Sequence, residues 1–435
     1  MDNECFNDLN TRNNYLRSSE TMTLIKKTKL SFLSLCWFSL IAGHYSSAYA
    51  NGFRLPEYTA AGVATSNALV ADTSRISAIA YNPAIMTLYS SGEKEPNSYL
   101  LSSNIIHIEY DTEVTVGTTT TQGNGKSKFN VPNLFISNQL SNKFSLGLLI
   151  HSPFGLETAW PRNTFSSFGG IAALETDLSR IKMFNTNVNL GYQLTPNTGI
   201  AVGINYYELL DLQFNSHATV IKGTGEGYGM NVALISTYED ISFGLSYRSA
   251  VHANATGTAS TSPATPIEVD ITFPEMLTLG INYKVNNTLK LELDIEHTGW
   301  NVYDNLNIRN SSDQSTLTLS TNNWKDTITY RTSAQYKIDK HQILFGYAYD
   351  KTPQSDNYFT ARVPDSDRQL FSIGYQYDFG TYQFETGLML VKFKDRNVNS
   401  STSYTFASDP NGTTAYNGRY RSNATVLSVG VNMIF

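Results

Sequence analysis

Strict alternation of apolar and polar residues constrains the fold of this chain more than any other feature. Every second residue is apolar in four segments, Leu289–Ile295, Ile343–Tyr349, Phe371–Tyr377 and Leu427–Phe435. In the first of them the intervening positions are charged: Lys290, Glu292, Asp294 and Glu296. A period of two residues places the two sets on opposite faces of a β-strand. An apolar outer face over a charged inner face predicts a closed barrel in lipid, because closure leaves no unpaired backbone group.

The connections between the alternating segments are short and long in turn. Tight turns are expected at Ser141-Asn142, Pro196-Asn197, Glu239-Asp240, Asn286-Asn287, Asp339-Lys340 and Phe379-Gly380. Long links rich in Gly, Ser, Thr and Asn lie around residues 111–130, 153–179, 215–226, 253–265, 301–322, 353–366 and 394–420. Six turns and seven links predict fourteen antiparallel strands with both ends in the periplasm, as in single-chain outer-membrane barrels. A soluble β-sandwich is the alternative, but it would not give this rhythm.

Composition agrees with an all-β transmembrane protein. Aromatic residues reach 12% and charged residues only 16%, below the roughly 25% of soluble proteins. The hydrophobic fraction is 41%, as expected when half of the strand residues face water. A net charge of −6 gives no support for nucleic-acid binding.

Residues 1–50 are predicted to be a cleaved signal region. Lys26, Lys27 and Lys29 precede an apolar run, residues 30–42, that is too short to span a bilayer as a helix. Ala48-Tyr49-Ala50 then provides small residues before a cut that would leave Asn51 at the mature N-terminus.

The polar residues before Met22 fit no part of a signal peptide, so Met22 is an alternative start. A lipoprotein reading would use Cys36, which bulky neighbours disfavour. Both cysteines, Cys5 and Cys36, lie in the predicted signal region. The mature chain therefore offers no disulfide and no thiolate metal site, as suits passage through an oxidising periplasm.

Residues 51–96 do not alternate and are predicted to form a small helical hatch, a plug inside the lumen of the barrel formed by residues 97–435. The alanine-rich pieces Thr59–Leu69 and Ile76–Met86 predict short helices, broken at Asn82-Pro83. The alternative is a periplasmic arm, which the small number of charges and the repeated apolar residues disfavour.

Several short motifs resemble the FadL-type outer-membrane family of long-chain fatty acid and aromatic hydrocarbon transporters. In chain order they are Gly52-Phe53-Arg54-Leu55, Gly62, Ala71-Asp72, Asn82-Pro83-Ala84, Ser152-Pro153-Phe154-Gly155-Leu156, Phe273-Pro274-Glu275-Met276-Leu277, Trp324-Lys325-Asp326, Ala348-Tyr349-Asp350-Lys351-Thr352-Pro353 and Val363-Pro364-Asp365-Ser366-Asp367-Arg368. Each motif is short, but their order and spacing cover nearly the whole mature chain.

The resemblance implies passive transport of long-chain fatty acids or similar hydrophobic molecules across the outer membrane, by binding in a pocket and lateral exit at a kinked third strand. It implies no enzymatic activity, catalytic residue, cofactor or metal. The expected partners are the hydrophobic ligand, outer-membrane lipid and lipopolysaccharide, and the barrel-assembly machinery, which would read the C-terminal Phe435. We expect no nucleic-acid partner and a monomeric barrel.

The resemblance also suggests site residues, each with a plainer alternative. Pro153, Phe154 and Gly155 would form the kink that opens a lateral gap, or would simply begin the loop after the third strand. Trp160, Phe165 and Phe168 would receive the ligand, or would pack their loop against its neighbour.

The charged candidate residues Arg54 and Asp350 likewise each have two possible roles. In the hatch, represented by Phe53, Arg54, Leu55, Asn82, Pro83 and Ala84, Arg54 would meet a ligand carboxylate or, more simply, a wall acid. Asp350 would face the lumen and hold the Asn82-Pro83-Ala84 turn, or be one more lumen carboxylate. Arg180 and Lys182 are candidates for lipopolysaccharide phosphates.

One departure from the family pattern bears on the ligand. The stretch Tyr206-Tyr207-Glu208-Leu209-Leu210-Asp211 is acidic where a cation is expected, and Ser320-Thr321-Asn322-Asn323 contains no lysine before Trp324. Uptake of neutral aromatic or aliphatic hydrocarbons is therefore the alternative function. An outer-membrane hydrolase or a structural barrel is a further alternative, but no Gly-x-Ser-x-Gly or His-Glu-x-x-His motif is present, and an adhesin needs no plug.

Overall fold

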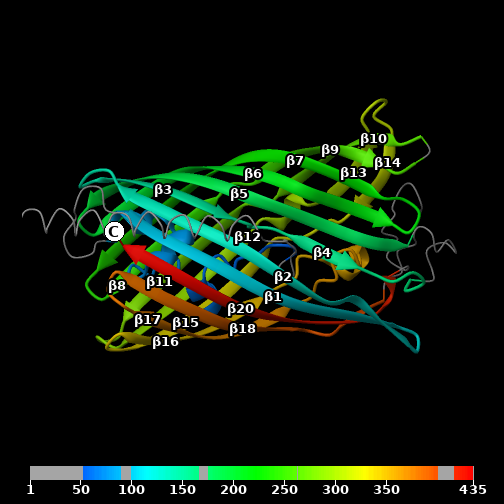
Figure 1. Ribbon diagram of the computed structural model, residues 1–435. Coiled ribbons are helices and arrows are strands. Elements are labelled where there is room, and N and C mark those ends of the chain that lie inside the picture. Colours follow the sequence, from blue (N-terminus) through cyan, green and yellow to red (C-terminus); the bar gives the residue numbers. More distant parts are fainter. Residues whose placement is uncertain (1–51, 90–98, 166–174, 262, 400–415, 435) are drawn as a thin grey trace, which may run out of the picture. The chain divides into compact units, whose positions relative to one another are not determined.

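The strands of the protein form one closed antiparallel sheet. The computed structural model describes residues 52–89, 99–165, 175–261, 263–399 and 416–434; the predicted signal region, Phe168 and Phe435 lie outside them. Closure is made by β1, which pairs with β2 on one side and with β20 on the other, from Leu100↔Ile434 to Thr115↔Arg419. Figure 1 shows the strands wrapped around a short blue N-terminal segment.

Twenty strand segments form fourteen strands, because six strands are interrupted. The uninterrupted ones are β1 (Tyr99–Val116), β2 (Thr119–Gln139), β5 (Thr176–Thr195), β6 (Thr198–Ser216), β7 (Ile221–Tyr238), β16 (His341–Asp350), β17 (Arg368–Asp378) and β20 (Gly418–Ile434). The interrupted ones are β3 (Phe144–His151) with β4 (Leu156–Ala159), β8 (Ile241–Arg248) with β9 (Val251–Ala259), β10 (Thr265–Phe273) with β11 (Met276–Lys284), β12 (Leu289–Thr298) with β13 (Asn305–Asn310), β14 (Thr316–Thr321) with β15 (Thr327–Ile338), and β18 (Tyr382–Phe393) with β19 (Arg396–Val398). The predicted fourteen-stranded barrel is confirmed.

All six predicted tight turns lie between strands at one end of the barrel, where β20 also ends. Short turns mark the periplasmic end of outer-membrane barrels. The long links, by contrast, were predicted wrongly as loops over much of their length. Residues 111–130, for example, belong to β1 and β2, which continue to a turn at Gly117 with φ +61°. Their polar composition reflects strands that extend beyond the bilayer into water.

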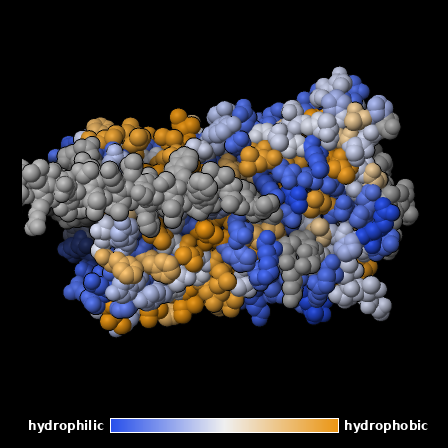
Figure 2. All heavy atoms as spheres, viewed as in Figure 1, coloured by the Kyte–Doolittle hydropathy of each residue, from blue (hydrophilic) through white to orange (hydrophobic). Residues whose placement is uncertain are grey.

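The outer surface carries an apolar band on the periplasmic half. Exposed apolar residues recur at every second position of neighbouring strands: Val188, Leu190, Val202, Ile204, Met230, Val232, Leu279, Ile281, Leu291, Leu293, Phe345, Phe371, Ile373, Leu427 and Val429. In Figure 2 the hydrophobic surface gathers toward this end, and the half that carries β4, β10 and β13 is mostly hydrophilic. Among the residues that the structure describes, no helix is long and apolar enough to span a bilayer.

The lumen also changes polarity along its length, from polar at the periplasmic end to apolar at the extracellular end, which is the reverse of the outer surface. On β5 the buried inward residues run from Asn189, Asn187 and Asn185 to Met183 and Ile181 toward the extracellular end. The inward side chains of that half form one apolar cluster, which includes Leu209, Val251, Ile267, Ile308 and Val391. The periplasmic half is thus apolar outside and polar inside, and the extracellular half is apolar inside, as in a water-soluble barrel.

The hatch occupies the polar half of the lumen. It contains α2 (Ala60–Ala64) and two 3₁₀ turns, η1 (Ile76–Ala80) and η2 (Pro83–Thr87). Thr59 caps α2 by accepting a hydrogen bond from Gly62 N. Asn82 caps η2 in the same way, with Pro83 at the first helical position. α2 packs against β17, β18 and β20, and η2 against β5, β6 and β7. The short helices predicted from the alanine-rich pieces are therefore present.

Candidate functional site

An aromatic cage at the centre of the barrel encloses the side chain of Phe53. The ring centroid of Phe53 lies 4.9 Å from that of Trp300, 5.2 Å from Tyr303 and 5.8 Å from Trp324. Phe154 and Phe273 complete the cage at 6.0 and 6.2 Å. Most of these contacts are edge-to-face, the favoured geometry for aromatic pairs. Phe53 is fully buried, so an apolar side chain of the chain itself fills an apolar site.

The third strand is interrupted beside this cage. Pairing between β2 and β3 ends at Leu134↔Ile150, and beyond it, among the described strands, β4 is in register with β5 alone. The interruption is formed by Ser152, Pro153, Phe154 and Gly155. β2 carries its own proline, Pro132, two residues beyond the last pair. Since proline cannot donate to a ladder, each edge of this ladder break carries a residue that disfavours pairing.

The N-terminal residues of the hatch bond to the kinked segment. Leu55 N donates to Pro153 O (2.8 Å) and Gly155 N donates to Phe53 O (2.9 Å), which makes an antiparallel bridge between Arg54 and Phe154. Buried backbone groups at membrane depth must be satisfied by protein. The hatch supplies partners that the broken ladder does not, so Phe53 and Leu55 are bonded directly to the kinked segment.

Three inward carboxylates of β12 hold successive points of the hatch. Glu296 forms a bidentate ion pair with Arg54, with Nη2 at 2.7 Å, and also pairs with Arg331 (3.0 Å). Asp294 accepts from the backbone N–H groups of Leu69 and Val70 (3.0 and 3.2 Å). Glu292 accepts from Ala71 N (2.7 Å). Of the two roles considered for Arg54, pairing with a wall acid is the one found.

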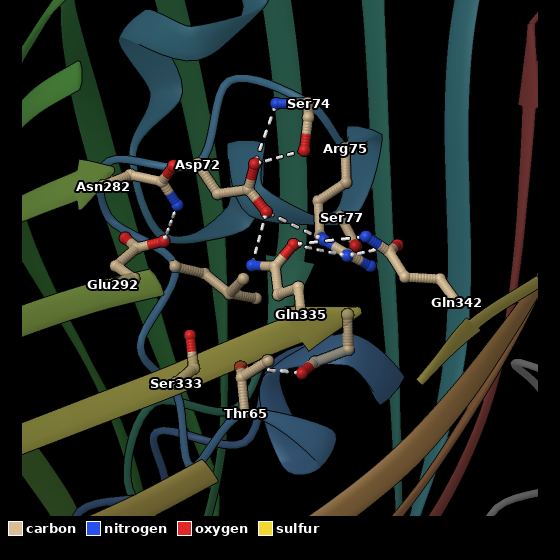
Figure 3. Close-up of polar contacts among 12 residues, drawn as sticks. Thr65, Asp72, Ser74, Arg75, Ser77, Asn282, Glu292, Ser333, Gln335 and Gln342 are labelled. Carbon is tan, nitrogen blue, oxygen red and sulfur yellow. Dashed lines mark hydrogen bonds and ion pairs between the residues drawn. The ribbon is translucent and has the colours of Figure 1, made fainter. Parts of the chain in front are cut away.

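A second anchor is the buried guanidinium of Arg75, which uses all five of its N–H groups. Its nitrogens lie 2.9 Å from Asp72 and 3.1 Å from Glu385, and they also donate to three wall glutamines, Gln335, Gln342 and Gln376, at 2.6 to 3.0 Å. Figure 3 shows Arg75 of the hatch donating to Gln335 and Gln342, and Gln335 donating in turn to Asp72. Burial alone would raise the pKa of Asp72, but the charge of Arg75 and hydrogen bonds from Ser74 hold it below its ordinary value.

Asp350 faces the lumen, as its parity predicts. Its carboxylate accepts from Thr329 and from Arg368 (Nε at 2.9 Å, Nη2 at 2.5 Å). Its charge also acts on Arg54, so it belongs to the cluster at the start of the hatch. The Asn82 turn is held elsewhere, since Asn82 Nδ2 donates to the carbonyls of Val70 (2.8 Å) and Leu234 (3.0 Å).

Trp160 and Phe165 are buried in the extracellular cap. Their rings contact each other at 5.3 Å, and Phe165 contacts Tyr416 at 5.2 Å. Trp160 Nε1 donates to Ala361 O (2.8 Å). The packing alternative therefore describes these two residues, while Phe168 lies outside the described residues.

The stretch from Tyr206 to Asp211 is not an acidic pocket wall. Glu208 is exposed on the outer surface, and Asp211 bonds to Arg180 (3.3 Å). The inward residues are Tyr207 and Leu209, and a shift of register between Leu209 and Leu212 follows. The expectation of an acidic lining fails because Glu208 has the outward parity of β6 and the register shift after Leu209 places Asp211 opposite Lys182. The lining here is apolar and aromatic.

A cavity of about 30 Å³, room for one or two waters, is bordered by Arg54, Tyr58, Arg248, Glu296 and Arg331. The apolar side chain that the cage surrounds is that of Phe53.

Sequence reasoning found Phe53, Arg54 and the kink, but not the cage or the Arg75 anchor. Phe273 ends β10, whereas Trp300 and Tyr303 lie in the interruption between β12 and β13, where no strand alternation predicts which way a side chain points. Two signals were available: Pro132 within an alternating segment, and Arg75 as a cation amid the apolar residues of the hatch.

A closed barrel with an apolar external band, an apolar inner half and an internal hatch bonded to its wall defines a plugged outer-membrane barrel. The family described as outer membrane protein transport protein (OMPP1/FadL/TodX) matches residues 41–435. Because this match covers nearly the whole chain, the chain belongs to that family of outer-membrane transport proteins, whose members are channels and not enzymes.

Individual relatives have low sequence identity to this chain but align with it over most of their length. Outer membrane protein P1 of Haemophilus influenzae is 23% identical over 94% of this chain and 99% of its own length. The long-chain fatty acid transport protein of Escherichia coli O6:H1 is 23% identical over 77% and 85%. Among solved structures, a Pseudomonas aeruginosa FadL homologue has a TM-score of 0.71 at 15% identity over 88% and 99% of the two chains. The Ralstonia pickettii toluene transporter TbuX has a TM-score of 0.63 at 16% identity over 87% and 98%. These structural likenesses concern the fold.

Proposed function

We propose that this barrel carries long-chain fatty acids or similar hydrophobic molecules passively across the outer membrane, and releases them sideways at the break beside Pro153. The observation that carries the proposal is the apolar inner lining of the extracellular half, which ends where β2 and the third strand stop pairing. Relatives whose names specify long-chain fatty acid or toluene transport support the substrate class.

Energetics favour a lateral path over one through the hatch. A hydrocarbon gains roughly 0.8 kcal/mol per CH₂ on leaving water, and an aqueous exit would forfeit that gain. The polar half of the lumen offers Asn185, Asn187, Asn189 and the Arg75 anchor, all of which would lose partners to an apolar guest. A sideways exit keeps the ligand in apolar surroundings from the cage to the bilayer.

The cage suggests how the path is controlled. A ligand that enters the cage replaces Phe53, and the bonds from Phe53 and Leu55 to the kinked segment are then lost with it. The wall at the kink would loosen only when a ligand has taken the place of Phe53. Phe53 thus acts as an internal substitute for the ligand.

The ligand's head group separates the two candidate functions. Arg54 is committed to Glu296, and the inner lining near the cage is apolar, which favours neutral hydrocarbons. Arg248 favours fatty acids: it is buried, and its hydrogen bonds, 3.0 to 3.5 Å long, go to the neutral groups of Asn187, Asn205 and the Ala80 carbonyl. A carboxylate could therefore find a cation beside the small cavity.

Equilibrium binding of a fluorescent long-chain fatty acid, with oleate, a long alkane and toluene as competitors, tests the choice. Displacement by oleate alone, lost in Arg248→Met, would establish carboxylate recognition. Displacement chiefly by alkane or toluene, unchanged in Arg248→Met, would establish a hydrocarbon channel. No competition by any of them would refute the proposed substrate class.

The exit is tested by changing the kink. Pro153→Thr with Gly155→Val should restore pairing with β2 and abolish uptake in cells, while binding in detergent persists. Removal of residues 51–96 should raise leakage of small polar solutes. Uptake at the wild-type rate in the first variant would exclude exit at this position.

A further inference from the structure

A basic groove lies on the outer surface of the barrel, on β17 and β18 and beside the end of β16. It encloses about 260 Å³, with Tyr349, Gln369 and Phe393 in its lining and two lysines, Lys392 and Lys394, at its edge. Both lysines are exposed, and they lie two residues apart on one face of the chain. Neither lysine belongs to the inner site, since both point away from the lumen.

The groove lies directly above the apolar band. Strand register places Tyr347, Phe371 and Leu390 in one row across β16, β17 and β18, all on the lipid-facing parity. The next outward row toward the extracellular end is Tyr349, Gln369 and Lys392. Two residues of strand span about 7 Å, so the first ammonium group stands immediately outside the hydrocarbon region.

The charges of the two lysines are not neutralised by the protein. Among the described residues, the ammonium groups of Lys392 and Lys394 have no carboxylate within ion-pair distance, whereas neighbouring Arg419 and Arg421 share Asp395 (2.5 and 3.0 Å). The one acid in the groove lining, Asp367, accepts from the backbone of Thr352 (3.2 Å) and from the hydroxyl of Tyr349 (3.4 Å), so the two ammonium groups outnumber the single carboxylate among the lining residues that face outward.

Two acids stand above the band at other positions of the wall. Beside β6 and β11, the residues above the band are Glu226 and Glu275, which accept hydrogen bonds from Tyr206 and Tyr247 (2.9 and 2.8 Å). An anion at the membrane surface would therefore be attracted more strongly to Lys392 and Lys394 than to the positions of Glu226 and Glu275.

We propose that this groove binds lipopolysaccharide through a phosphate of its acylated diglucosamine anchor. A phosphate group offers the negative charge that two unpaired ammonium groups attract, and the acyl chains would continue down over Tyr347, Phe371 and Leu390. The sugar would lie against Tyr349 in the groove. The partner is thus a phosphorylated lipid of the outer leaflet, held on one side of the barrel.

Native mass spectrometry of the barrel purified from outer membranes tests this, with bisphosphorylated lipid A as the probe. Lys392→Ser with Lys394→Ser should weaken binding about 30-fold, which corresponds to ~2 kcal/mol for two surface cations. Lys337→Ser with Lys340→Ser removes the same charge from two exposed lysines at the periplasmic end and should change affinity less than about two-fold.

The role of the phosphate is tested by changing the lipid instead of the protein. Dephosphorylated lipid A should bind the wild-type barrel as weakly as bisphosphorylated lipid A binds the double variant. Equal affinity of the wild type and the groove variant would overturn the site, and binding of phosphatidylglycerol as tight as lipid A would overturn the identity of the lipid. Since all four lysines are exposed, heat-modifiable gel mobility should confirm folding of every variant.

Discussion

Replacement of Arg75 by alanine should open the hatch far more often. The change removes a buried guanidinium and leaves the carboxylates of Asp72 and Glu385 without their cation. Removing one partner of a buried ion pair costs about 3–5 kcal/mol, because the other charge stays buried and uncompensated. If that cost falls on the closed state, the open fraction rises by about two to three and a half orders of magnitude at about 1.4 kcal/mol per decade.

A single cysteine in the hatch measures this opening. With Cys5 and Cys36 replaced by serine, Ala78→Cys would be the sole thiol of the chain. Ala78 is fully buried, so a maleimide reagent reaches it only when the hatch moves. In the regime of fast opening and closing, the labelling rate is proportional to the open fraction. Arg75→Ala should therefore label at least about 100-fold faster than the parent.

Two further variants isolate the cause. Arg180→Ala removes an arginine from the ion pairs with Glu157 and Asp211 in the extracellular half and should leave the labelling rate unchanged. Arg75→Lys keeps the charge but not the five-fold bonding, and should give an intermediate rate. The reasoning is refuted if Arg75→Ala, folded by gel mobility, labels at the parent rate.

Three other perturbations have defined outcomes. Asp294→Ala removes the acceptor of two hatch N–H groups and should speed labelling of Ala78→Cys about ten-fold or more, since a hydrogen bond to a charged group contributes about 1.5–3 kcal/mol; an unchanged rate would contradict this. Phe53→Ala empties the cage, so toluene should bind there and change the fluorescence of Trp300 and Trp324, at a stability cost of about 3–5 kcal/mol, and an unchanged emission on titration would count against the cage as a ligand site. Burial raises the pKa of Asp365, which accepts a hydrogen bond from Gly52 N, to about 6. The contribution of this carboxyl group to stability is complete below its ordinary pKa and is lost as pH rises through about 6. The melting temperature should therefore fall between about pH 5 and 7.5, and Asp365→Asn should remove that fall.

Strand number and turn positions were predictable because they rest on local patterns. The alternation in β12 and the turn at Asp339-Lys340 need no knowledge of distant residues. Strand length was not predictable in the same way. Beyond the bilayer, strands such as β1 and β2 expose polar residues on the outside, so their composition matches that of a loop until burial of Ile108 and Phe129 reveals the inner face.

The site was predictable only where it is local in sequence. Pro153 and Gly155 disfavour pairing by their own backbone chemistry. The cage could not be derived, because Trp300 lies in an interruption between β12 and β13 and Trp324 in another between β14 and β15. The roles of Asp294 and Glu292 were hidden for the same reason, since their partners are backbone N–H groups more than two hundred residues away.

The reversal of polarity along the barrel gives the ladder break its physical meaning. On the third strand the outward residues Leu146, Leu148 and Ile150 belong to the lipid-facing band, and the segment that follows contributes Phe154 and Leu156 to the apolar interior. The break therefore stands where the apolar surface passes from the inside of the wall to the outside. An opening nearer the periplasm would lead from a polar lumen, and one nearer the extracellular end would lead into water. Of the positions along this strand, the interrupted one is therefore the position that the proposed lateral exit requires, since a hydrophobic molecule crossing there would stay in apolar surroundings.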